Sequence, residues 1–251
     1  MIGDQYGREV PTNGESLRLE AVTTSVGFDD LLDVSLARNH PHFDTMIVVT
    51  DHADRATQQV ARKHGAILVI TDLFYRNGRK FNKGAAINAG FSRFQYYGWR
   101  MHLDSDIILP DNFRRLLFNH TALDRRGLYG ADRIDVVGTD ELARVHRPQH
   151  AHTFLLCSGH HRPLGARYVD PLRGYVPIGY FQLWHAQPER YAPIEYPYSL
   201  GDAAHDDVSF AEQWPREHRH LLPTVICYHL VPKPVTKWGE NWEGRRQPRL
   251  T

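Results

Sequence analysis

The sequence lacks the features that define several common protein classes. Only two of its 251 residues are cysteines, Cys157 and Cys227, which excludes a disulfide framework and a cysteine-rich zinc site. No apolar run approaches the roughly 20 residues of a membrane-spanning helix, and the N-terminus, MIGDQYGREV, lacks the basic and apolar regions of a secretory signal. We therefore expect an unprocessed cytoplasmic protein with no integral membrane segment.

Net charge and glycine motifs exclude further classes. The formal net charge is +1, so no overall field favours nucleic acid or a membrane surface. Neither G-x-x-x-x-G-K-[ST] nor G-x-G-x-x-G occurs, which weakens the P-loop kinase and dinucleotide dehydrogenase interpretations. A cluster of histidines lacks H-E-x-x-H and C-x-x-C spacing and is interrupted by prolines, so we interpret it as surface loop; it comprises His146, His150, His152, His160 and His161.

The chemical centre of the sequence is residues 99–110, WRMHLDSDIILP. Apolar residues on both sides predict a buried strand that is interrupted where Asp104 and Asp106 emerge. Two adjacent carboxylates repel each other unless a positive charge lies between them, and Mg²⁺ or Mn²⁺ shared with substrate phosphates supplies one. The alternative is that Asp-Ser-Asp is only a turn that ends the strand.

Strands and helices alternate over the first half of the sequence. This order predicts a mostly parallel α/β sheet with helices on both faces, whose ligands bind beyond the carboxyl ends of the strands. The expected strands cover residues 17–28, 45–50 and 66–70, and the expected helices begin at 29 and cover 53–64 and 84–97. Further along, we expect helices at 112–123 and 208–214 and strands at 129–137 and 222–230.

Three expected strand ends carry polar side chains toward the same edge of the sheet. They are the hydroxyls of Thr23, Thr24 and Ser25, the carboxylate of Asp51, and the pair Asp104 and Asp106. Separate structural explanations would be needed for each, whereas one ligand site explains all three. The first hundred residues therefore look like a nucleotide-binding half.

These motifs carry a resemblance to a known family. The order of the TTS strand end, VVTD, FNKGAAINAGF and HLDSDIILP resembles the donor half of GT-A fold glycosyltransferases, above all the family 2 group and the polypeptide N-acetylgalactosaminyl and β-1,4-galactosyl transferases. The resemblance implies that Asp51, with Asp54 as second choice, contacts the base or ribose. It also implies donor binding by a segment that contains Lys83, Gly84, Ala86 and Asn88, and a helix N-terminus there suits phosphate.

The resemblance extends to catalytic and metal-binding residues in the second half. Asp206 and Asp207 stand where the family has an acidic pair before a helix, which implies that Asp207 is the catalytic base; helix capping is the alternative, and His205 is a rival base. His229, at the end of an apolar strand, matches a late metal ligand that joins Asp106 and Asp104. A nitrogen ligand favours Mn²⁺ over Mg²⁺.

Two further segments have open interpretations. Residues 174–185, GYVPIGYFQLWH, offer Tyr180, Phe181 and Trp184 for stacking on an acceptor sugar, although an aromatic core strand fits equally. The C-terminal residues 233–251 combine lysines, arginines and Trp238, which suits either a lid over the donor diphosphate or a basic tail.

Together these features predict one GT-A domain. Residues 1–16 form a tail, 17–110 the donor half, 111–232 the acceptor and catalytic half, and 233–251 the possible lid. The expected activity is metal-dependent, inverting transfer of a sugar from a nucleotide diphosphate donor, with uridine favoured, to a hydroxyl of a glycan, small molecule or modified DNA base. A nucleotidyltransferase and a non-catalytic nucleotide-sugar binder remain alternatives.

Overall fold

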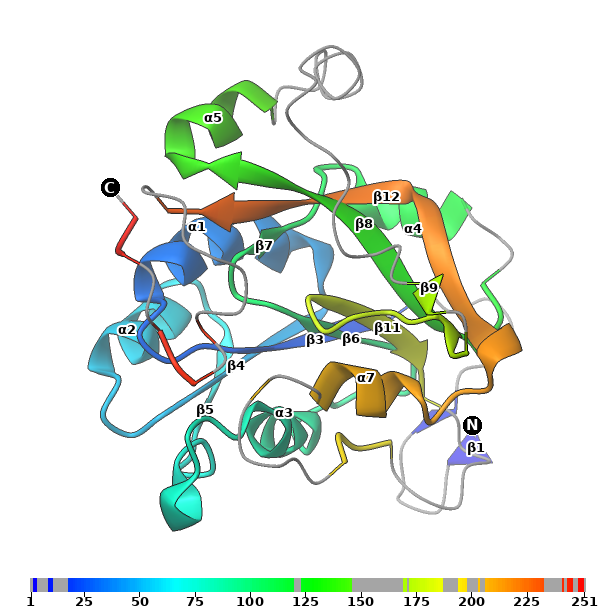
Figure 1. Cartoon of the computed structure of the whole chain (residues 1–251), viewed down its shortest axis with the longest axis horizontal. Helices are drawn as coiled ribbons and strands as arrows, with labels where there is room; N and C mark the ends of the chain where they lie inside the picture. The colour runs from blue at the N-terminus through cyan, green and yellow to red at the C-terminus, as the bar shows by residue number, and fades with distance from the viewer. Residues whose placement is uncertain are drawn as a thin grey trace.

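The fold is built on one mixed sheet. The computed structural model describes residues 2–3, 9–10, 18–119, 123–145, 169–170, 172–186, 194–197, 203, 206–232, 241, 243–245 and 248–250. Its main sheet has eight strands in the order β5-β4-β3-β6-β11-β8-β12-β7 (Figure 1). These are β3 Leu19–Thr24, β4 Thr45–Thr50, β5 Ile67–Ile70, β6 Trp99–Leu103, β7 Ile107–Ile108, β8 Leu128–Val137, β11 Phe181–His185 and β12 Arg219–Val231.

The pairing of these strands separates two halves of the sheet. In the first half, β5, β4, β3 and β6 are all parallel, as their alternation with helices predicts. In the second half, β11 runs antiparallel to β6 and β8, β12 is parallel to β8, and β7 is antiparallel to β12. The expected mostly parallel α/β architecture in a single domain is confirmed.

Helices cover both faces of the sheet, because residues that alternate along each buried strand point to opposite sides. Ala21 and Val48 pack with α1 Asp29–Asn39, α2 Arg55–Lys63 and α4 Phe113–Asn119. Val22 and Val49 pack on the other face with α3 Lys83–Phe91 and α7 Asp206–Ala211. Within the described part of the chain, every helix is too short or too polar to span a bilayer.

The structure corrects two expected helix boundaries and adds a helix that was not expected. Helix α3 ends at Phe91 and not at residue 97, because the Glu20 carboxylate accepts the backbone N–H groups of Gln95 (2.8 Å) and Tyr96 (3.0 Å) and holds this stretch outside the helix. Helix α7 covers 206–211, earlier than expected. Residues 138–145, which follow an expected strand and lie outside every expected helix, form helix α5 Gly138–Val145, whose Glu141 side chain accepts the Val137 N–H.

Short antiparallel ladders lie outside the main sheet. The strands β1 Ile2–Gly3 and β2 Glu9–Val10 pair in the region expected to be a loose tail. The strands β9 Val169–Asp170 and β10 Gly174–Tyr175 also pair with each other. Single-turn 3₁₀ helices η1 His40–His42, η2 Arg76–Gly78 and η3 Arg216–His218 complete the described elements.

Side chains of α1 fasten the segment that contains the two aspartates. The Ser35 hydroxyl donates to the Ser105 carbonyl oxygen at 2.6 Å, between Asp104 and Asp106 in sequence. The Asn39 side chain donates to the Ile107 carbonyl oxygen at 2.7 Å and accepts the Leu109 N–H at 2.9 Å. Strand β7 pairs with β12 on its other side, so Asn39 satisfies backbone groups at the open edge of the sheet.

We expect Asn39→Ala to lower the free energy of unfolding by about 2–4 kcal/mol, because Asn39 is 2% exposed and its loss leaves two buried backbone groups without partners. Urea denaturation measures the change. The exposed Arg62 on α2 supplies a control, since Arg62→Ala should stay within about 0.5 kcal/mol of wild type. Equal stabilities of the two variants would contradict the assigned role of Asn39.

Candidate functional site

The turn that joins β6 to β7 carries Asp104 and Asp106 at the edge of the sheet. Backbone hydrogen bonds fix it, from the Asp104 N–H to the Tyr180 carbonyl oxygen (3.1 Å) and from the Leu230 N–H to the Asp106 carbonyl oxygen (2.8 Å). The Asp104 side chain is 28% exposed and that of Asp106 19%. Two partly buried carboxylates therefore stand two residues apart, and each needs a compensating positive charge.

Lys83 compensates Asp104. It is the first residue of α3, which begins there because the Asn82 side chain caps the helix by accepting the Ala85 N–H at 3.3 Å. The Lys83 ammonium donates to Asp104 Oδ1 at 2.5 Å. Burial disfavours the charged amine, but Asp104, Asp207 and Asp106 outweigh it and raise the pKa of Lys83. Burial raises the pKa of Asp104, although Lys83 opposes that effect.

His229 compensates Asp106 from the opposite side. Its Nε2 lies 3.3 Å from Asp106 Oδ2, and its Nδ1 lies 2.7 Å from Asp135 Oδ1. Burial disfavours the imidazolium, yet the two carboxylates raise the pKa of His229 to about 9. In return, His229 outweighs the effect of burial and lowers the pKa of both Asp106 and Asp135. Without a metal ion, a protonated His229 bridges two carboxylates at neutral pH.

The donor atoms here suit a divalent cation only in part. Asp106 Oδ1 is buried and has no hydrogen-bond partner, as expected of an oxygen that accepts an external ligand. Asp106 and His229 Nε2 supply one oxygen and one nitrogen, while Asp104 is held by Lys83. Among the described residues, no group of three or more His, Cys, Asp or Glu side chains is arranged to hold a metal ion. A cation here would therefore share its coordination with a ligand's oxygens.

The acids of α7 have different surroundings. Asp206 is 4% exposed, and its Oδ2 accepts the Gly84 N–H at 2.8 Å, so it caps α3 from another helix. A Cβ at Gly84 would lie 2.9 Å from that oxygen, which explains the glycine. Asp207 is less buried; its Oδ2 accepts the Gly179 N–H and its Oδ1 the Val208 N–H, both at 2.8 Å. Asp207 therefore remains the stronger candidate for a base.

A buried chain of hydrogen bonds connects the Asp207 backbone with the surroundings of Asp104. The Gln182 side-chain nitrogen donates to the Asp207 carbonyl oxygen at 3.0 Å, so its oxygen accepts the Tyr196 hydroxyl. His102 Nδ1, 2.7 Å from that hydroxyl, then acts as donor. This tautomer leaves His102 Nε2 with a free electron pair 3.6 Å from Asp104 Oδ1. Burial, reinforced by Lys83, lowers the pKa of His102 well below its ordinary value.

The strand-end hydroxyls and Asp51 lie where the sequence places them. Thr23 and Ser25 are each 1% exposed and Thr24 is 7% exposed; Thr23 Oγ1 and Ser25 Oγ have no hydrogen-bond partner. Asp51 makes a local turn by accepting the Ala53 N–H at 2.8 Å. Asp54 caps α2 through the Thr57 N–H (3.0 Å) and accepts the Gly27 N–H (2.6 Å), which favours Asp51 over Asp54 as the ligand-binding acid.

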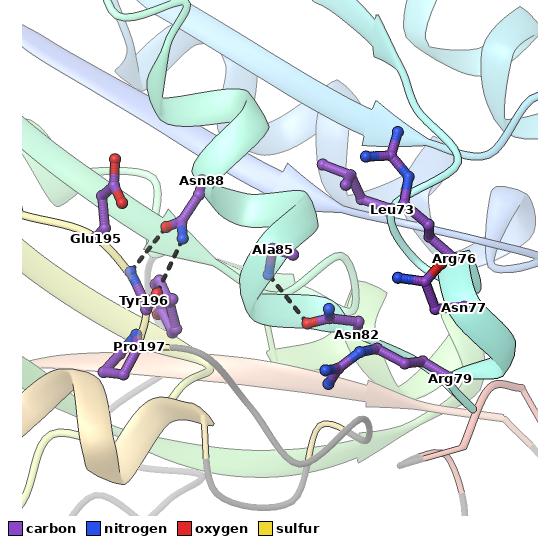
Figure 2. A pocket seen from close by; sticks show the side chains of 10 residues that line it. All are labelled: Leu73, Arg76, Asn77, Arg79, Asn82, Ala85, Asn88, Glu195, Tyr196 and Pro197. Carbon is purple, nitrogen blue, oxygen red and sulfur yellow. Dashed lines mark hydrogen bonds between the residues drawn. The ribbon is translucent and has the colours of Figure 1, made fainter.

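Asn88 faces a pocket of about 300 Å³ beside α3 (Figure 2). Its side chain donates to the Tyr196 carbonyl oxygen at 2.9 Å and accepts the Tyr196 N–H at 2.7 Å, so it holds the segment 194–197 against α3. A donor-binding role for Asn88 stays a prediction. The pocket is lined by Leu73, Arg76, Asn77, Arg79, Asn82, Ala85, Asn88, Glu195, Tyr196 and Pro197.

The three aromatic residues proposed for the acceptor lie in the core. Tyr180, Phe181 and Trp184 are 3%, 0% and 1% exposed. The Tyr180 hydroxyl donates to the Ala131 carbonyl oxygen, and Trp184 packs against Phe210 of α7 at 5.2 Å between ring centroids. Their burial favours the alternative interpretation, an aromatic core strand, and we leave them out of the acceptor site.

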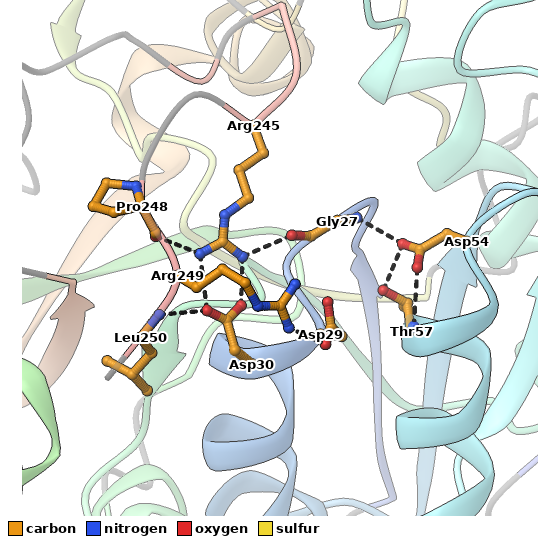
Figure 3. Close-up of polar contacts among 9 residues, drawn as sticks. All are labelled: Gly27, Asp29, Asp30, Asp54, Thr57, Arg245, Pro248, Arg249 and Leu250. Carbon is orange, nitrogen blue, oxygen red and sulfur yellow. Dashed lines mark hydrogen bonds and ion pairs between the residues drawn. The ribbon is translucent and has the colours of Figure 1, made fainter.

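The described part of the C-terminal segment docks on the start of α1 (Figure 3). Arg245 donates to both carboxylate oxygens of Asp30 and to the Gly27 carbonyl oxygen at 2.6 Å. Arg249 pairs with Asp29, and Glu243 pairs with Lys80 of the basic loop before α3. Arg245 thus contacts the loop that follows the Thr23–Ser25 strand end, and a lid role for the C-terminal residues stays a prediction.

Several predicted residues lie outside the described residues. They are the rival base His205, the donor-binding Trp238, and the histidines from His146 to His161. Sequence reasoning in turn missed Asp135, His102, Gln182 and Tyr196. The only available signal for Asp135 was polar alternation within YGADRIDVV, and none marked the other three.

Comparison with solved structures shows the fold. S. aureus TarS (residues 1–349) superposes with a TM-score of 0.54 at 11% identity, over 85% of this chain and 60% of that chain, and this likeness shows the GT-A fold alone. Glucosyl-3-phosphoglycerate synthase from Mycobacterium tuberculosis, solved with Mg²⁺ and UDP, gives a TM-score of 0.47 at 13% identity, over 86% of this chain and 70% of that chain. Mannosyl-3-phosphoglycerate synthase from Rubrobacter xylanophilus gives a TM-score of 0.36 at 21% identity, over 47% of this chain and 40% of that chain.

No protein-family model and no curated protein matches the sequence. The predicted GT-A fold is confirmed by the structural likeness. The narrower resemblance to family 2 and to the N-acetylgalactosaminyl and galactosyl transferases stays a prediction.

We expect the stability of the metal-free protein to fall with pH through His229. Its pKa rises from 6.5 to about 9 on folding, so its contribution is complete below pH 6.5 and is lost as pH rises through about 9. Thermal unfolding in chelator should show a loss of about 2–3 kcal/mol over this range that His229→Gln lacks. Parallel pH profiles for the two proteins would contradict the bridging role.

Proposed function

We propose that the chain is a metal-dependent glycosyltransferase that uses a nucleotide diphosphate sugar, with a uridine donor favoured. The observation that carries this proposal is the Asp106–His229 pair with its unpartnered carboxylate oxygen. The pair lies beside the Lys83–Asp104 pair, and both adjoin the edge where β3 and β6 end. In sheets of this kind, ligands bind beyond the carboxyl ends of the strands.

Each group has a distinct task in this proposal. Asp106 and His229 would hold Mn²⁺ or Mg²⁺, which when bound supplies Lewis acidity toward the departing diphosphate. Lys83, which pairs with Asp104 in this structure, would exchange that partner for a phosphate oxygen of the donor, and the N-terminus of α3 adds a favourable dipole. Thr23, Thr24, Ser25 and Asp51 line the adjacent strand ends, where the nucleoside would bind.

Asp207 is the proposed base. Its carboxylate is oriented by the Gly179 and Val208 N–H groups, and each oxygen retains a free electron pair. Its backbone carbonyl is held by Gln182, which limits rotation of the α7 start. Removal of the acceptor proton by Asp207 and attack opposite the diphosphate would invert the anomeric centre.

The donor half can be tested without knowing the acceptor, by screening nucleotide sugars for slow hydrolysis with and without Mn²⁺. We expect Asp106→Asn to lower the Mn²⁺-dependent rate by about 10² or more, since a bound metal ion is worth several kcal/mol in the transition state. The exposed Asp140→Asn is a matched control and should hydrolyse donor normally. Full metal-dependent hydrolysis by Asp106→Asn would refute the assigned site.

Asp207→Asn separates the base from a helix cap. Asn keeps only one of the two oxygens that accept the Gly179 and Val208 N–H groups, so we expect a folded protein that is about 1–3 kcal/mol less stable than wild type. Because water takes the place of the acceptor in donor hydrolysis, loss of the base should slow hydrolysis by roughly 10² to 10⁴, while calorimetric binding of UDP with Mn²⁺ stays unchanged. Asp206→Asn is measured in parallel as the other acid of the pair. Normal hydrolysis by Asp207→Asn would refute the assignment of Asp207 as the base.

A further inference from the structure

Asp135 and His229 are direct neighbours on parallel strands. The register of β8 and β12 pairs Asp135 with His229, and the register of β12 and β7 pairs His229 with Ile107. The histidine therefore lies on a central strand between two strands that each bring one carboxylate, Asp135 from β8 and Asp106 from the turn before β7. This arrangement follows from the backbone pairing and does not depend on a flexible loop.

The two ring nitrogens of His229 are not equivalent. Nδ1 lies 2.7 Å from Asp135 Oδ1, a normal hydrogen-bond length, whereas Nε2 lies 3.3 Å from Asp106 Oδ2, which is long for such a bond. A neutral imidazole has one N–H, and the shorter contact favours Nδ1 as its position. The electron pair of Nε2 then points toward Asp106, whose other carboxylate oxygen has no hydrogen-bond partner.

Nearby charge supports a charged Asp135. Arg133 lies two residues away, on the same side of β8, and its guanidinium stacks on the Tyr180 ring at 4.5 Å. His229 and, more weakly, Arg133 lower the pKa of Asp135 despite its partial burial. A carboxylate that accepts Nδ1–H increases the electron density at Nε2 and fixes the plane of the ring.

We propose that Asp135 is a positioning residue that sets the tautomer and orientation of His229, so that Nε2 is presented with Asp106 as a ligand for a divalent cation. The cation is part of the proposed function, on which this inference rests; the tautomer of His229 is a property of the metal-free chain. Asp135 touches neither substrate nor cation in this proposal.

The first experiment measures Mn²⁺ binding by electron paramagnetic resonance, with and without UDP. We expect Asp135→Ala to bind Mn²⁺ about 10- to 100-fold more weakly than wild type. Asp135→Asn, which keeps an acceptor but not the charge, should lie between the two. Asp140→Ala, an exposed acid at the start of α5, is the control and should bind normally. Unchanged Mn²⁺ affinity in Asp135→Ala would overturn the proposal.

The second experiment reads the tautomer directly by ¹⁵N nuclear magnetic resonance of the imidazole, in chelator at about pH 10, above the pKa of His229, which is about 9. We expect the Nδ1–H tautomer in wild type and a shift toward Nε2–H in Asp135→Ala. The Nε2–H tautomer in wild type would overturn the proposal, because Asp106 and not Asp135 would then hold the proton. Circular dichroism confirms that each variant is folded.

The two experiments distinguish failure of this proposal from failure of the proposed function. Wild type that shows Nδ1–H and binds Mn²⁺ in an Asp135-dependent way, but binds no nucleotide, supports the role of Asp135 and refutes the proposed function. Metal-dependent UDP binding that is unchanged in Asp135→Ala supports the proposed function and refutes the role of Asp135. Wild type that binds no Mn²⁺ under either condition refutes both.

Discussion

The central constraint in this structure is the electrostatic cost of placing Asp104 and Asp106 in one partly buried turn. Each carboxylate raises the energy of the other, and burial removes much of the water that would screen them. Two cationic side chains relieve this repulsion, and they come from elements far apart in sequence: Lys83 from α3 and His229 from β12. The first half of the sheet and the late strands are therefore held together at this turn.

Other hydrogen bonds fix the position of the same turn and of the helix that carries Lys83. Ser35 and Asn39 on α1 fix its backbone, and Asp206 joins the starts of α7 and α3 through the Gly84 N–H. Asp206 leaves no room for a Cβ at Gly84, so the two helices approach closely at this glycine. Lys83 is the residue before Gly84, so this close approach also fixes its position. A substitution in any of these supporting residues would act on the charged pairs without touching a ligand.

Sequence reasoning predicted the parts of the fold and site that depend on local pattern. Alternation of apolar strands and helices predicted the order of β3 to β6 with their helices, and the family resemblance singled out Asp104, Asp106, Lys83 and His229, which the fold brings together. The pairing of Asp135 with His229 depends on the register of two strands separated by more than eighty residues, which no local pattern encodes. The aromatic run at 180–184 shows the opposite limit, because composition alone does not tell a stacking surface from a buried strand.

The docking of Arg245 on Asp30 has a consequence for how the chain folds during synthesis. Asp30 lies 215 residues before Arg245 in the chain, and Asp29 lies 220 residues before Arg249, so α1 leaves the ribosome long before these two acids gain their arginine partners. Until then two adjacent acids stand at the start of α1 without their arginine partners, where the helix dipole favours negative charge. The loop that follows the Thr23–Ser25 strand end, whose Gly27 carbonyl oxygen accepts a hydrogen bond from the same arginine, would lack this contact over that interval. The contacts at the start of α1 would thus be completed only after residue 249 has been made.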